Sequence, residues 1–112
     1  MSGKSVNSAL YDAIPQLGRL REEVLYGDVW QQPELSARDR SLVTCAILAA
    51  LGRQEELGHH MRRAVSNGVT TEALRGLVVQ TALYAGWPCA VMAGKAGLEL
   101  FTDQSKATED GK

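Results

Sequence analysis

The chain has 112 residues, which is enough for one domain and too few for two. Hydrophobic residues make up 45% of it, and a net charge of -1 with both signs interspersed excludes the basic footprint of a nucleic-acid-binding protein. The longest apolar run, Cys45 to Leu51, is too short for a membrane span, and the polar N-terminus lacks the apolar run of a signal peptide. Cys45 and Cys89 form no CxxC pair. We therefore expect a cytoplasmic protein with free thiols and with no nucleic-acid or membrane partner; sequence alone leaves a bridge between the two cysteines open.

The apolar residues are mainly Leu, Ala and Val, which favour helices over sheets. We expect an all-α, compact domain of five to six helices over residues 9–102. The polar segments 1–8 and 103–112 are expected to be a disordered N-terminus and a disordered tail.

The first helix is predicted to run from Ala9 to about Tyr26, with Pro15 near its start or at a kink. It is expected to end at Gly27, because glycine is favoured just past a helix end. A loop over 28–35 follows, and its Trp30 either pins the loop to the core or lines a pocket.

The second helix is predicted to open at Ser36, which with Asp39 resembles a capping box, and to end at Gly52. Between residues 42 and 51 only Thr44 is polar, which predicts burial on all sides. In so small a domain, such a helix is either central or covered by another subunit.

The third helix, Arg53 to Asn67, separates two adjacent histidines. At 100° per residue an apolar stripe forms, consisting of Leu57, Met61, Ala64 and Val65. His60 lies about 60° to one side of Leu57, beside Arg53 and near Glu56, whereas His59 points away from the stripe. His60 is therefore the best candidate for chemistry, with a packed or interface histidine as the alternative.

The remaining elements are two more helices. Gly68 is placed for a left-handed cap, and Thr70 is expected to cap the fourth helix. Its inner face is predicted to comprise Leu74, Leu77, Val78, Thr81, Ala82 and Ala85. The residues Gly86-Trp87-Pro88 break the chain, with Pro88 in the first turn of a last helix. Small residues that allow a close helix crossing follow, namely Ala90, Ala93, Gly94 and Gly97.

Several ordered blocks resemble the carboxymuconolactone decarboxylase family. They are YGDVW at 26–30, LSARDRSLVT at 35–44, ALGR at 50–53, EELGHH at 55–60, NGVT at 67–70 and QTALYAGWP at 80–88. The resemblance runs from about Tyr11 to Leu100. It implies an alkylhydroperoxidase D-like helical fold that assembles into homo-oligomers, with trimers or hexamers expected.

The family includes two chemistries, decarboxylation of 4-carboxymuconolactone in the β-ketoadipate pathway and thiol-dependent peroxide defence. The peroxidases use a glutamate, a CxxC pair and a histidine. Aligned on His60, the two cysteine positions fall on Arg53 and Glu56 and the glutamate position on Ser41. Disulfide cycling needs two thiols, so the resemblance favours decarboxylation. Cys45 stands in an apolar stretch, where burial would raise its pKa and leave it inert.

The substrate is expected to be 4-carboxymuconolactone or, if the chain is a paralogue, a related carboxylated lactone or keto acid. Its decarboxylation requires a group that binds the carboxylate, stabilisation of the developing negative charge, and a proton donor. We expect His60 to act as general acid/base, Arg40 or Arg53 to bind a carboxylate, and Glu56 to orient the imidazole. Possible pocket residues are Glu23, Trp30 and Trp87. No metal or organic cofactor is required, because the substrate is its own electron sink.

Several alternatives remain at this stage. Arg40 could form surface or intersubunit salt bridges, and Arg53 with Glu56 could be a local helix pair. Tyr84 and Trp87 could serve packing alone. The chain could also be a thiol peroxidase, or a non-catalytic ligand-binding or assembly protein of the same fold.

Overall fold

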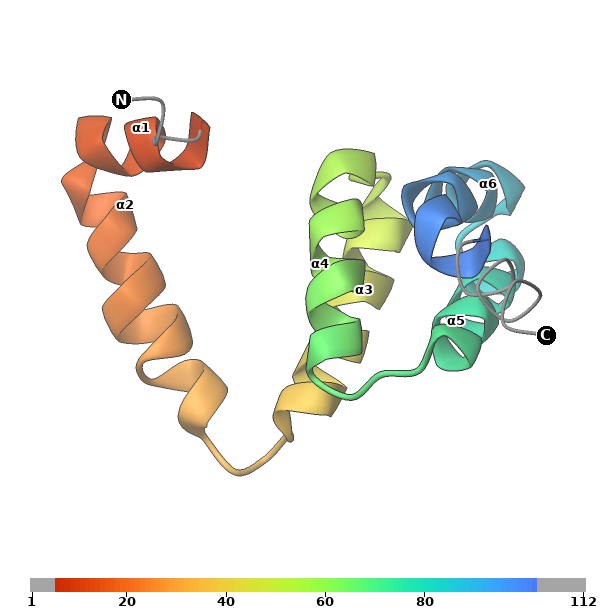
Figure 1. Cartoon of the computed structure of the whole chain (residues 1–112), viewed down its shortest axis with the longest axis horizontal. Helices are drawn as coiled ribbons and strands as arrows, with labels where there is room; N and C mark the ends of the chain where they lie inside the picture. Colours follow the sequence, from red (N-terminus) through yellow and green to blue (C-terminus); the bar gives the residue numbers. More distant parts are fainter. Residues whose placement is uncertain (1–5, 103–112) are drawn as a thin grey trace, which may run out of the picture. The chain divides into compact units, whose positions relative to one another are not determined.

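The computed structural model describes residues 6–102, and all regular elements in that range are helical (Figure 1). In chain order they are α1 (Val6–Ala13), α2 (Pro15–Arg19), a π-helical stretch η1 (Leu20–Tyr26), a 3₁₀ turn η2 (Val29–Gln31), α3 (Ala37–Leu51), α4 (Gln54–Ser66), α5 (Thr71–Tyr84) and α6 (Trp87–Ala96). The expected all-α class is confirmed for this part of the chain. None of these helices is long and apolar enough to cross a membrane.

The chain divides into two compact units, with the boundary between Glu34 and Leu35. The N-terminal unit holds α1, α2, η1 and η2. It differs from the single helix expected from Ala9 to Tyr26. The chain breaks at Ile14, and Pro15 opens α2 in the first turn, where its missing N–H is tolerated. Residues 6–8, expected to be disordered, belong to α1, whereas 1–5 and the expected tail 103–112 lie outside the described residues.

Gly27 follows the end of η1 as predicted, but it does not form a left-handed cap. Its φ of −76° is right-handed, and a Cβ at this position would lie 2.6 Å from the carbonyl oxygen of Glu22. Glycine is thus required by close backbone approach. The aromatic residues of this unit pack locally, since the guanidinium of Arg21 lies 5.0 Å from the ring centroid of Tyr26 and 5.6 Å from that of Tyr11.

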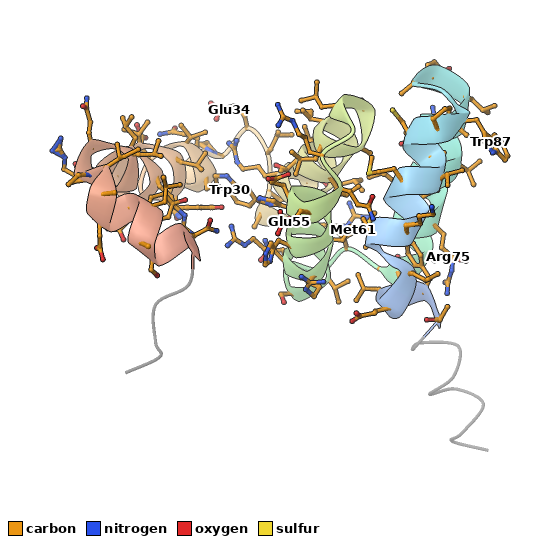
Figure 2. All side chains as sticks on the ribbon, turned by 90° about the horizontal axis from the view of Figure 1, so that it is seen from above. Trp30, Glu34, Glu55, Met61, Arg75 and Trp87 are labelled. Atoms are coloured by element: carbon orange, nitrogen blue, oxygen red, sulfur yellow. The ribbon has the colours of Figure 1, made fainter. Side chains whose placement is uncertain are left out.

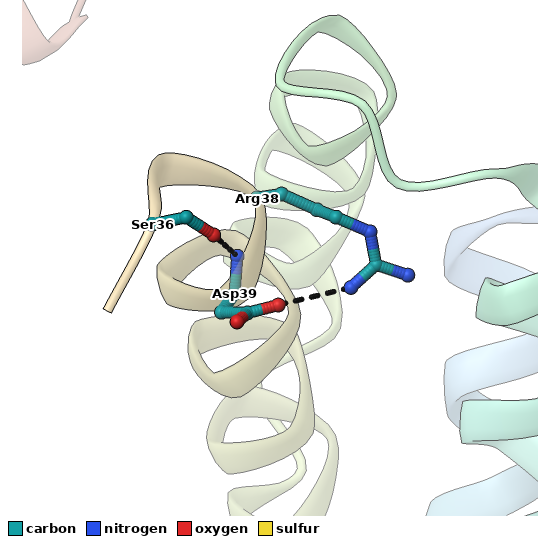
Figure 3. Close-up of polar contacts among 3 residues, drawn as sticks. All are labelled: Ser36, Arg38 and Asp39. Carbon is teal, nitrogen blue, oxygen red and sulfur yellow. Dashed lines mark hydrogen bonds and ion pairs between the residues drawn. The ribbon is translucent and has the colours of Figure 1, made fainter. Parts of the chain in front are cut away.

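The C-terminal unit begins with an N-cap that follows the sequence prediction. Ser36 Oγ accepts a hydrogen bond from the backbone N–H of Asp39 at 3.1 Å, and the Asp39 carboxylate pairs with Arg38 at 3.0 Å (Figure 3). Gly52 closes α3 in the left-handed region, with a φ of 74°. The cap at Thr70 is confirmed as well, because its Oγ1 accepts from the N–H of Ala73 at 3.0 Å.

The core of this unit lies where α3, α4, α5 and α6 meet. Its largest fully buried side chains include Leu57, Met61 and Leu74. Met61 lies on the side of α4 that faces α6 (Figure 2), and a Cβ on Gly97 would come within 2.8 Å of its sulfur. A Cβ on Gly58 would lie 3.4 Å from the carbonyl oxygen of Ala96. The expected close crossing by small residues is therefore confirmed at α4 and α6.

Two expectations about burial are wrong in the chain as described. On α3 only one face is buried, through Ser41, Cys45 and Ala49, while Ile47 and Leu51 remain 53% and 64% exposed. On the neighbouring helices, Val65 and Ala85 are exposed instead of facing the core. The core of one chain is too small to cover an all-apolar helix, so the second reading of α3, a helix covered by another subunit, stays a prediction.

Candidate functional site

Residues on α3 and α4 are brought together by antiparallel packing, which one buried hydrogen bond fixes in register. Asn67 Nδ2, just after α4, donates to Ser41 Oγ in the second turn of α3 at 2.9 Å. Ser41 is only 1% exposed. From this fixed point the two helices run in opposite directions, side by side (Figure 1).

The two sides of α4 face different neighbours. Gly58 and Met61 approach α6, whereas Asn67 contacts α3. A helical rotation of 100° per residue puts His60 on the α3 side, about 20° from Asn67. His60 is half-buried there. His59, about 100° round the helix from His60, is exposed, with its Nδ1 3.5 Å from a guanidinium nitrogen of Arg62. The separation of the two histidines is confirmed.

Arg40 and Thr44 lie one turn apart on the edge of α3 next to α4, beside the buried face that includes Ser41. Thr44 Oγ1 donates to the carbonyl oxygen of Arg40 at 2.7 Å, and the Nε of Arg40 is buried. This edge of α3 meets the side of α4 that carries His60. We call the surface along this line of contact the outer seam. Its polar members are Arg40, Ser41, Thr44, Glu56, His60, Arg63 and Asn67.

Two predicted residues lie at one end of the outer seam, at the start of α4. Glu56 is on the same side of α4 as His60, one turn earlier, and is exposed. Arg53 precedes the helix at the N-cap position and is also exposed. Of the two expected carboxylate-binding arginines, Arg40 is therefore the half-buried one and Arg53 the solvated one.

The three possible pocket residues lie in other places. Glu23 and Trp30 belong to the N-terminal unit, where Glu23 is exposed and Trp30 packs on Tyr26 with ring centroids 5.5 Å apart. Trp87, at the start of α6, is 71% exposed and points outwards (Figure 2). Their pocket role stays a prediction.

The cysteines are both free. Burial raises the pKa of Cys45 to about 11, as expected for a thiol in an apolar core. Cys89 is half-buried, and its Sγ lies 3.7 Å from the carbonyl oxygen of Ala50. Among residues 6–102, no three His, Cys, Asp or Glu side chains gather in a way that could hold a metal ion.

A separate groove of about 420 Å³ lies between α3 and α5. Its lining is almost wholly apolar and consists of Leu42, Ala46, Ala50, Ala73, Gly76, Leu77, Gln80, Thr81, Tyr84 and Ala85. Neither His60 nor Arg40 contributes to it. The groove and the outer seam are thus two different surfaces of α3.

Sequence reasoning missed two residues of the outer seam, Asn67 and Arg63. Asn67 was assigned only to the end of the helix, yet its amide carries the hydrogen bond to Ser41. Arg63 was not singled out, although its spacing of three residues from His60 places both on one side of the helix. That spacing was visible in the sequence, whereas the partner of Asn67 was not.

Comparisons with known proteins agree with the sequence resemblance. A family model described as "Carboxymuconolactone decarboxylase family" matches residues 15–98. A 4-carboxymuconolactone decarboxylase from Acinetobacter baylyi is 44% identical over 84 residues, covering 75% of this chain and 63% of that protein. A nitrosuccinic acid decarboxylase from Metarhizium robertsii is 35% identical over 97 residues, covering 83% of this chain and 67% of the relative. The match thus spans less than two thirds of the Acinetobacter protein.

Proposed function

Because the chain belongs to the carboxymuconolactone decarboxylase family, we propose that it is a cofactor-independent decarboxylase of a small carboxylated molecule. The proposed substrate is 4-carboxymuconolactone or a related carboxylated lactone or keto acid. The two relatives support this proposal, since both are named as decarboxylases and their names specify acidic substrates. The observation that carries it is that His60 and Arg40 are both half-buried on the two helices that meet along the outer seam.

In the proposed reaction the bond between the substrate carbon and its carboxylate breaks, and carbon dioxide leaves. The electron pair moves into the conjugated carbonyl of the lactone, whose oxygen becomes negative. Arg40 binds a carboxylate and supplies positive charge, which counts for more on a half-buried seam than in bulk water. His60 then delivers a proton to carbon, since imidazole can exchange protons near neutral pH.

The roles of the remaining predicted residues follow from their places. Glu56, one turn before His60, is proposed to orient the imidazole, and Arg53 to attract the anionic substrate from the exposed end of the seam. Glu23, Trp30 and Trp87 are proposed as further pocket residues of a site that is shared between subunits of an oligomer.

A thiol peroxidase of the alkylhydroperoxidase D type is less well supported. Arg53 and Glu56 stand where that chemistry needs thiols. A buried Cys45 with a pKa near 11 is protonated at neutral pH and a poor nucleophile. The purified protein should therefore not consume an organic hydroperoxide with dithiothreitol as reductant.

The proposed activity is tested by incubating the full chain with 4-carboxymuconolactone and, separately, with nitrosuccinic acid, and measuring carbon dioxide release. We expect release from at least one of the two, without added metal and in the presence of a chelator. Release from neither, by a folded protein, would favour the non-catalytic ligand-binding or assembly protein.

We also propose that the protein is a homo-oligomer, a trimer or a hexamer. Large apolar side chains remain exposed, including Tyr84 at 83% in the lining of the α3–α5 groove and the adjacent Leu83 at 77%. Monomeric proteins rarely leave apolar patches of more than a few hundred Å² uncovered. Light scattering after size exclusion tests this proposal. Tyr84→Glu should dissociate the assembly, whereas Leu98→Glu, outside the groove, should leave it intact. A monomeric wild-type protein would contradict it.

The cytoplasmic location stays a prediction.

A further inference from the structure

The outer seam carries a second guanidinium that the proposed chemistry has not yet used. Arg63 is half-buried and lies on the same side of α4 as His60, three residues further along. Three residues of α-helix advance about 4.5 Å along the axis and rotate by about 60°. Arg63 is therefore the cationic residue of α4 placed nearest to His60 along this side.

Register places Arg63 between His60 and Arg40 along the seam. Ser41 lies opposite Asn67, so the antiparallel helices bring the residues around Thr44 opposite Arg63. Arg40 lies one turn from Thr44, towards the Asn67 end. The order along the seam is therefore His60, then Arg63, then Arg40, with the exposed Glu56 on the far side of His60.

The neighbouring arginines differ from these two in burial. Arg62 is exposed, lies about 160° round α4 from His60, and its guanidinium contacts His59. Arg38 is exposed, and its guanidinium pairs with Asp39. Among the arginines of the described C-terminal unit, residues 35–102, the half-buried ones are Arg40 and Arg63, and both are on the seam.

From this arrangement, and resting on the proposed decarboxylase function, we propose that Arg63 binds a substrate carboxylate next to His60. The planar guanidinium fits a carboxylate with two parallel hydrogen bonds. With Arg40 as a second cationic group further along, the seam would take a dicarboxylate. One carboxylate is retained throughout the reaction, and the other leaves as carbon dioxide.

Arg63 is assigned to the carboxylate that the product retains. This assignment predicts how KM and kcat respond when Arg63 is replaced. A group that stays ionised throughout is bound about equally in the ground state and in the transition state. Losing such an interaction raises KM and leaves kcat nearly unchanged. Loss of a charge-assisted pair should raise KM by about 10- to 100-fold. A role for Arg63 in folding alone would produce no such separation of the two constants.

The test compares Arg63→Gln with Arg62→Gln, a matched change at the adjacent exposed position. Rates of carbon dioxide release from 4-carboxymuconolactone give KM and kcat, and titration calorimetry with succinate measures dicarboxylate binding without turnover. We expect Arg63→Gln to raise KM and weaken succinate binding, and Arg62→Gln to resemble wild type. Arg63→Lys keeps the charge and loses the planar fork, so its KM should lie between the two.

Unchanged KM and unchanged succinate binding in a folded Arg63→Gln protein would overturn the assignment, as would a wild-type protein that does not bind succinate. Circular dichroism of each variant establishes that it is folded, and Arg63→Lys serves if Arg63→Gln is not. If the wild-type protein releases no carbon dioxide, the proposed function fails. Succinate binding that is lost in Arg63→Gln and kept in Arg62→Gln would then still support a carboxylate site.

Discussion

Asn67 Nδ2 donates a hydrogen bond to the buried Ser41 Oγ at 2.9 Å, across 26 residues of sequence, and so joins the end of α4 to the start of α3. The two helices that form the outer seam are also joined by the short turn at Gly52 at their other ends. The seam is thus held at both ends, and the residues between, including His60, have a fixed register. A proton donor benefits from such preorganisation.

Removing the acceptor should destabilise the fold measurably. In Ser41→Ala the Asn67 amide loses its acceptor in a buried place, which costs about 1–3 kcal/mol. The matched control is Ser66→Ala, an exposed serine at the end of α4 whose hydroxyl bonds to the Arg62 carbonyl oxygen at 3.4 Å. Its free energy of unfolding should change by less than about 0.5 kcal/mol. Urea unfolding measures both, and equal effects would contradict the role given to Asn67.

Two glycines near the end of α6, Gly94 and Gly97, should respond differently to an added methyl group. A Cβ at Gly97 would meet Met61 Sδ at 2.8 Å and the Phe101 ring at 2.8 Å. Gly97→Ala should therefore lower the free energy of unfolding by about 1–3 kcal/mol. A Cβ at Gly94 has only an ordinary contact, 3.9 Å from Val78. Gly94→Ala should be neutral or stabilising. Thermal unfolding of the pair checks this, and a stabilised Gly97→Ala would contradict the close crossing.

Burial of the Cys45 thiol predicts slow alkylation and a loss of stability in alkali. Its pKa is raised from 9.0 to about 11, so the folded protein holds this proton more tightly than the unfolded chain does. The stabilising contribution is complete below about pH 9 and is lost as the pH rises through 11. In a Cys89→Ala protein, iodoacetamide at pH 8 should label Cys45 slowly until urea is added. Rapid labelling of the folded protein would contradict the burial of Cys45.

Local signals made much of the fold predictable from the sequence. The caps at Ser36 and Thr70 and the left-handed Gly52 depend on nearest neighbours, so they could be placed correctly. The side of α4 that carries His60 followed from helical periodicity alone. The family resemblance gave His60 a counterpart in related proteins, and the structure adds the half-buried place where it stands.

Features that depend on distant partners could not be predicted. Nothing in the sequence shows that Asn67 bonds to Ser41, because that contact needs the α3–α4 register. The burial of α3 was overestimated, because an apolar sequence does not reveal how much surface one chain can cover. In the N-terminal unit, the break at Ile14 and the π-helical η1 replaced one continuous helix. Apolar spacing alone did not separate these conformations.

Carbon dioxide release by His60→Ala and His59→Ala is the most direct test of the proposed site. The two histidines are adjacent on α4, yet His60 is half-buried on the outer seam and His59 is exposed, about 100° round the helix from it. With 4-carboxymuconolactone as substrate, we predict that His59→Ala retains wild-type kcat. Folded His60→Ala should lose about 10²- to 10⁴-fold, as expected for loss of a general acid. Full activity of a folded His60→Ala protein, or equal losses in both variants, would contradict the outer seam as the catalytic site.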